Sequence, residues 1–152
     1  MEAMYQFLRE QSKKNANIKP VDFSQLFQGK TAYEVLQGVV QGYVNMNHQE
    51  KLLTFYKVIY SERSIQPMAA RIVAEETERM IIATKQLFYA MVIHKLLHFE
   101  NADMSAVSFA MTVHGLMDYE LDQKYGYDEE PKNLLDEYLK WFCTENQVEA
   151  GD

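Results

Sequence analysis

Two histidines four positions apart have the spacing that most directly suggests chemistry. His94 and His98 would share one face of a continuous helix, and two imidazoles placed in this way can bind the same metal ion. A third ligand could come only from Glu100 or His114, brought close by tertiary packing. The alternative for the pair is a half-exposed polar face near a helix end, where a histidine interacts favourably with the helix dipole. We favour this alternative and expect no metal site.

The remaining reactive side chains give no enzyme signature. The sequence has no G-x-S-x-G elbow, no glycine loop of the phosphate-binding kind, no H-E-x-x-H motif and no E-x-x-H motif of di-iron bundles. Cys143 is the only cysteine, and beside Trp141 and Phe142 we interpret it as a packed apolar side chain. The sequence therefore predicts neither enzymatic activity nor a cofactor.

The composition predicts one compact domain over residues 1–152. Hydrophobic residues make up 47% and charged residues 24% of the chain, which has only 3 prolines and 6 glycines. This balance favours an all-α fold over a disordered chain or a turn-rich β-sandwich. The net charge of −7 repels nucleic-acid phosphates, so we expect no DNA binding by this chain alone.

Other features of the sequence predict a cytoplasmic protein. The longest apolar stretches, such as Leu87–Leu97, fall well short of the roughly 20 residues that cross a bilayer. Met1–Arg9 lacks the basic start of a secretion signal. A single cysteine is typical of a chain kept in a reducing compartment. We therefore expect no membrane partner.

The first half of the chain is predicted to form helices separated by polar segments. Met1–Lys14 carries apolar residues at the spacing of one buried helix face, and Asn15–Lys30 is interpreted as a loop with one helical turn. Thr31 and Glu34 match the S/T-x-x-E capping box and indicate the start of a helix. After a polar break, a broad apolar face predicts a further helix over Glu50–Glu62.

The second half is predicted to contain longer helices. Because proline suits a first helical turn and neither glycine nor proline occurs from there to Phe99, one long helix is expected over Pro67–Phe99. Asn101 or Asp103 can cap the next helix, Met104–Tyr125. A last helix carries an apolar stripe over Leu134–Phe142.

From His48 onward, the order of these elements resembles the regulatory domain of the TetR family of transcription regulators. The stretch Lys51–Pro67 is similar to the family segment in which a proline opens a long helix. Leu96–Asp103 resembles the bend that follows, and His114-Gly-Leu-Met117 lies in an apolar helix with a central glycine. A terminal helix led by Pro131 completes the resemblance.

The resemblance implies the effector-binding and dimerisation domain of a bacterial transcription regulator, in which a small molecule controls DNA binding allosterically. Family members read DNA through a helix-turn-helix module that precedes this domain. Here Met1–Lys14 resembles the helix that links the two parts, and no such module comes before it. We therefore expect DNA binding only through a module that this chain lacks.

The family also implies a homodimer in which the last two helices of both subunits form a four-helix bundle. Met104–Tyr125 carries more apolar residues than one internal face needs, which allows this arrangement. The expected interface residues are Val107, Met111, His114, Met117, Leu135, Tyr138, Leu139 and Phe142. The alternative is that these stripes only cover the core of the monomer.

A pocket for a small apolar or aromatic effector is implied among the central helices, where rings and thioethers offer adaptable contact surface. The candidate ligand-binding residues are Phe55, Tyr56, Tyr60, Met80, Phe88, Tyr89, Met91 and His114. Stripes of this kind also form ordinary cores. The alternative function is therefore a helical protein-interaction or dimerisation module without a small ligand.

Overall fold

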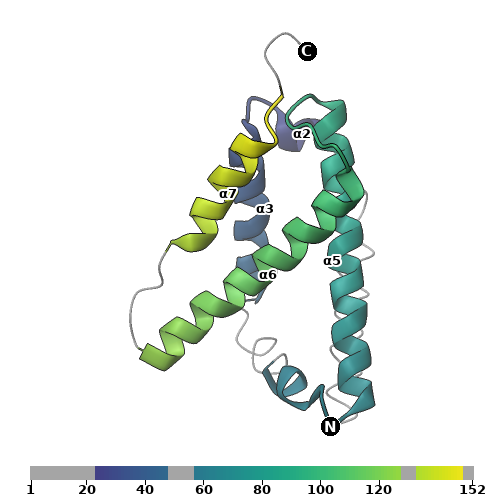
Figure 1. Cartoon of the computed structure of the whole chain (residues 1–152), viewed down its shortest axis with the longest axis vertical. Coiled ribbons are helices and arrows are strands. Elements are labelled where there is room, and N and C mark those ends of the chain that lie inside the picture. The colour runs from purple at the N-terminus through teal and green to yellow at the C-terminus, as the bar shows by residue number, and fades with distance from the viewer. Residues whose placement is uncertain (1–22, 48–56, 128–132, 149–152) are drawn as a thin grey trace. The chain divides into compact units, whose positions relative to one another are not determined.

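The computed structural model describes residues 23–47, 57–127 and 133–148 (Figure 1). Every regular element in these ranges is a helix and none is a strand, which confirms the predicted all-α class. The helices are α2 (Phe23–Phe27), α3 (Ala32–Asn47), α5 (Pro67–Ile93), α6 (Ala102–Tyr127) and α7 (Leu134–Glu145), and residues 57–62 are helical as well. In the described part of the chain, no helix combines the length and apolarity that crossing a membrane requires.

The chain divides into two compact units. The first unit consists of residues 1–22 and 41–82, and the second of residues 23–40 and 83–152, so α3 and α5 contribute residues to both. The predicted helix Met1–Lys14 and most of the predicted helix Glu50–Glu62 lie outside the described residues. The prediction of one domain over residues 1–152 is not tested by this division into units.

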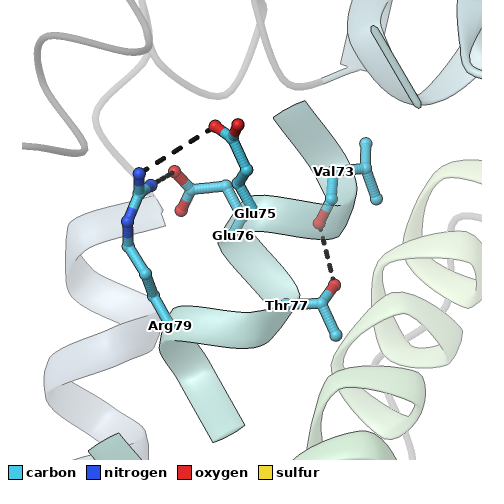
Figure 2. A network of polar contacts seen from close by, with 5 residues as sticks. All are labelled: Val73, Glu75, Glu76, Thr77 and Arg79. Atoms are coloured by element: carbon cyan, nitrogen blue, oxygen red, sulfur yellow. Dashed lines mark hydrogen bonds and ion pairs between the residues drawn. The ribbon is translucent and has the colours of Figure 1, made fainter. Parts of the chain in front are cut away.

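The described part of the first unit centres on the start of α5. Pro67 occupies the first helical position, as predicted, and the Gln66 carbonyl accepts a bond from the Ala70 amide at 3.1 Å. Figure 2 shows the next turns, where the Arg79 guanidinium lies 2.9 Å from the Glu76 carboxylate and 4.0 Å from that of Glu75. Pairs at this spacing on a partly exposed helix each add only a few tenths of a kcal/mol.

Phenylalanine rings form the core of the second unit. The ring centroids of Phe88 and Phe99 are 4.7 Å apart, and those of Phe109 and Phe142 are 4.8 Å apart. Phe88 joins the two pairs, because its centroid lies 5.2 Å from that of Phe109. These rings come from α5, the segment before α6, α6 and α7, so burial of one aromatic cluster ties all four segments together.

The predicted capping box at the start of α3 is confirmed. The Glu34 amide donates to Thr31 Oγ1 at 3.2 Å, and the Thr31 amide donates to Glu34 Oε1 at 3.3 Å. The same first turn is tied to α7, since the Tyr33 hydroxyl donates to Asp136 Oδ1. Lys140 Nζ lies 3.2 Å from the other Asp136 oxygen and 5.8 Å from the centroid of the Tyr33 ring.

The predicted extension of α5 to Phe99 is wrong, because the helix ends at a left-handed residue that is not glycine. Lys95 has a φ of 59°, its amide donates to the Val92 carbonyl at 3.0 Å, and the Leu96 amide donates to the Met91 carbonyl at 2.8 Å. This pair of bonds is the Schellman motif, which usually places glycine at the left-handed position. A rule that looks for glycine or proline at a helix end does not find such a stop.

Asparagines set the ends of α6 and α7. Asn101 Oδ1 accepts the Met104 amide at 3.0 Å, so Asn101 rather than Asp103 caps α6. The helix continues beyond the predicted end at Tyr125. At the end of α7, Asn146 Nδ2 donates to the Phe142 carbonyl at 2.8 Å. The Asn146 carbonyl in turn accepts the His98 amide at 2.8 Å, which ties the segment after α5 to the end of α7.

Candidate functional site

The predicted ligand-binding residues are divided between the two units. Phe55 and Tyr56 lie outside the described residues. Tyr60 and Met80 are half-buried in the first unit, where the Arg63 guanidinium carbon lies 5.1 Å from the centroid of the Tyr60 ring. The others, Phe88, Tyr89, Met91 and His114, belong to the second unit.

Within the second unit, these four residues do not line one space. Phe88 and Met91 are fully buried in the core, whereas Tyr89 is exposed on another side of α5. His114 is half-buried on α6, and its Nδ1 atom lies 3.5 Å from Asp118 Oδ2. None of them lines either of the two grooves described below. In the second unit, two of the four candidate residues, Phe88 and Met91, thus belong to the core.

An apolar groove runs between α6 and α7. It has a volume of about 330 Å³ and is lined by Thr112, Leu116, Leu134, Glu137, Tyr138 and Trp141; we call it the α6–α7 groove. Burial raises the pKa of the Tyr138 phenol, against a smaller lowering effect of its hydrogen bond with Thr112. The hydroxyl stays protonated at neutral pH, so the groove presents rings and aliphatic carbon with little charge apart from Glu137.

Beside the groove, α6 has an exposed face without charge. We call it the α6 crest: Met104, Ser108, Met111 and Gly115, which share one side of the helix through their four- and three-residue spacing. Met104 is 59% exposed and Met111 50% exposed. Between Met104 and Met117 the sequence contains no Asp, Glu, Lys or Arg.

The predicted dimer-interface residues are placed differently on the two helices. On α6, Met111 is exposed on the crest, and Val107, His114 and Met117 are half-buried. On α7, Tyr138 is half-buried, whereas Leu135, Leu139 and Phe142 are buried in the core of their own unit.

Two outward apolar side chains of α7, Leu134 and Trp141, are not among the expected interface residues. Leu134 is 41% exposed and Trp141 is 56% exposed, and with Tyr138 they share one face through the same helical spacing. That spacing was visible in the sequence. The adjacent leucines at positions 134 and 135 made two phases possible, and only packing shows which phase faces inward.

A second groove, of about 340 Å³, has mixed polarity. Its lining residues are Thr31, Ala32, Tyr33, Leu96, Leu97, Lys140, Cys143, Thr144 and Gln147. The hydrogen bond from Tyr33 and the nearby Lys140 hold the pKa of Asp136 below its usual range, despite an opposing effect of desolvation. Burial raises the pKa of the Cys143 thiol to about 11, so almost no nucleophilic thiolate is present at neutral pH.

The histidine pair does not keep the helical spacing that suggested metal binding. Both residues follow the end of α5, and the His94 ring packs edge-on against Phe27 at a centroid distance of 5.2 Å. The backbone of His98 is bonded to Asn146. Among the described residues, no three His, Cys, Asp or Glu side chains gather so that they could hold a metal ion.

Comparison with models of known protein families, with curated proteins and with solved structures finds no match to this chain. The exposed apolar side chains of the second unit include Tyr89, Val92 and Ile93 on α5, and those of the α6 crest and the α6–α7 groove.

Proposed function

We propose that this chain is the homodimerising regulatory domain of a TetR-like transcription regulator, and that two copies pair through α6 and α7. The observation that carries this proposal is the outward surface of these helices. It exposes Met104, Met111, Leu134 and Trp141, while the α6 crest carries no charged side chain. Leaving these apolar side chains in water is unfavourable, and covering them with a like surface removes that cost.

A second copy is the partner that this surface fits best. A chain with a net charge of −7 repels itself at most orientations, so two copies associate most easily where neither presents charge. Most soluble homo-oligomers are closed twofold dimers, in which each copy uses the same patch. The α6 crest is such an uncharged surface. Together with the α6–α7 groove, it supplies one patch that both copies can use.

The regulatory part of the proposal rests on the order of the helices. A long proline-led helix, a bend, an apolar helix and a short terminal helix follow one another as in the TetR family, where the last two pair between subunits. DNA contact would then belong to a separate helix-turn-helix module, because the acidic chain alone repels phosphates. An effector would act by favouring one arrangement of the dimer.

A dimerisation module without a small ligand is the second candidate. The observation that favours it is the full burial of Phe88 and Met91, two of the residues expected to contact an effector. The two candidates share the dimer surface and differ in a bound molecule. Native mass spectrometry of the purified chain separates them, since a retained small molecule would support the effector and a ligand-free dimer the simple module.

The dimer itself is tested by introducing one positive charge. Trp141→Lys should convert the dimer into a monomer, because burying an unpaired ammonium group at the interface is costly. Lysine lowers the magnitude of the net negative charge, so added repulsion cannot explain the loss. Ile93→Lys is the matched control: Ile93 is 77% exposed in the same unit but lies on α5.

Both variants should keep the helical circular dichroism of the parent chain. Mass measured by light scattering over a range of concentrations then reports association alone. A parent chain that stays monomeric at high micromolar concentration, or a Trp141→Lys variant that is still dimeric, would sink the proposal.

A further inference from the structure

The α6 crest and the α6–α7 groove lie side by side on one surface. Thr112 of the groove comes four residues after Ser108 and three residues before Gly115 of the crest, and helix residues at these spacings are neighbours on the surface. Because the α6 crest lies next to the α6–α7 groove, its side chains cannot fill the groove of their own chain. In a twofold dimer, however, the α6 crest of each copy can lie in the α6–α7 groove of the other copy, because both copies use the same surface.

We propose that Met111 of each copy is seated in the α6–α7 groove of the other copy, with Ser108 and Gly115 allowing the two helices to approach closely. The inference rests on the proposed dimer and adds its register. The contact is mutual, so one pair of surfaces is used twice. In this register, the methionine that enters the groove lies between two small residues of its own helix, Ser108 and Gly115.

The chemistry of the groove fits a methionine side chain. Leu116 and Leu134 supply aliphatic contact, while Tyr138 and Trp141 supply rings whose centroids are 5.9 Å apart. A thioether adapts its shape to such a site and interacts favourably with aromatic rings. Half of the Met111 side chain is exposed in the single chain, so the contact requires no unfolding of the core.

The small size of Gly115 is compatible with close approach of a second helix. A glycine within a helix is less favourable than alanine, yet a Cβ atom at position 115 would meet no heavy atom within 4 Å. Packing inside the chain therefore does not require glycine here. Its small size becomes useful if the helix of a second copy passes over this position, one turn after Met111.

Gly115→Gln and Gly38→Gln form a matched pair that tests this inference. Gly38 is also helical and exposed, with open space at its Cβ position, but it lies on α3. Glutamine is a better helix former than glycine, so both variants should raise the thermal midpoint of the monomer. Only Gly115→Gln should weaken the dimer, by at least about tenfold, a change typical of a blocked interface core.

Cysteine cross-linking tests the register directly. Met111→Cys and Glu137→Cys are made separately in a Cys143→Ser chain and then mixed under mild oxidation. Glu137 is an exposed residue that lines the groove, so the mixture should form a disulfide-linked heterodimer. Ile93→Cys mixed with Glu137→Cys is the control and should not cross-link, because disulfides need Cα atoms within about 7 Å.

The outcomes separate the register from the dimer. A cross-linked Met111→Cys and Glu137→Cys pair, together with a selective effect of Gly115→Gln, supports the seated methionine. A dimer by mass that neither cross-links in this pair nor responds to Gly115→Gln overturns the register and leaves the proposed dimer standing. A parent chain that is monomeric at all concentrations overturns both.

Discussion

The two faces of α7 carry similar side chains in different surroundings. Leu135, Leu139 and Phe142 point into the core of the second unit, whereas Leu134 and Trp141 face outward beside α6. Both faces are apolar, so composition does not distinguish them. The difference lies in what each face contacts: the inner face stabilises the folded chain, and we propose that the outer face binds a second copy.

The largest expected effect comes from the inner face. Phe142→Ala should lower the free energy of unfolding by about 3–5 kcal/mol, because it leaves a cavity among Phe88, Phe99 and Phe109. Trp141→Ala removes an aromatic ring one position earlier and should lower it by less than about 1 kcal/mol in the monomer. Urea unfolding at a concentration where the chain is monomeric measures both values. Equal losses would mean that the two faces do not differ.

The next largest effect should be a weaker dimer, caused by changes on the outer face of α7 and visible as a dependence on protein concentration. Leu134→Lys should weaken the dimer by about tenfold to hundredfold, since an apolar interface residue is replaced by an ammonium group. The chain has a single tryptophan, so the emission of Trp141 reports this surface and should shift to longer wavelength on dilution. Leu134→Met is the conservative control and should follow the parent curve. Identical dilution curves for the lysine variant and the parent would exclude Leu134 from the interface.

How far the sequence predicts this molecule depends on whether the signal is local. The Thr31 and Glu34 capping box, the Pro67 start of α5 and the Asn101 cap are local, and each is present in the structure. The inward phase of α7 is not local, because Leu134 and Leu135 offer two stripes until α6 covers one of them.

The candidate site was harder to predict for the same reason. Phe88 and Met91 have the residue types of an effector pocket, but those types also suit a core, and the core is where the structure places them. The spacing of Trp141 from Leu134 and Tyr138 places the three on one helix face, but it does not show whether that face is buried or exposed. Surface exposure, which a sequence does not contain, separates these roles.

A change distant from both faces of α7 should affect stability without affecting association. Lys95→Gly should raise the free energy of unfolding by up to about 1 kcal/mol, because glycine adopts the left-handed conformation without the steric cost that lysine has there. The greater entropy of glycine in the unfolded chain offsets part of this gain. Thermal unfolding measures the shift, and light scattering should show the parent dissociation constant. Lys124→Gly, inside α6, should instead lower the midpoint.

The smallest effect should come from Asp136, which lies at the edge between the faces and bonds to Tyr33 of α3. Its pKa is lowered in the folded chain, chiefly by the Tyr33 hydrogen bond, from an ordinary value of 3.8. A lowered carboxyl pKa adds stability above the unfolded value, and this contribution is lost as pH falls through the folded value. The stability lost by Asp136→Asn relative to the parent should therefore be present at pH 6 and shrink below about pH 4.

Tyr33→Phe removes only the hydroxyl and should abolish most of this pH dependence, whereas Glu145→Gln at the exposed end of α7 should leave it unchanged. If the free energy of unfolding falls equally with pH below about 4 in the parent chain and in Tyr33→Phe, the hydrogen bond between α3 and α7 does not contribute to stability.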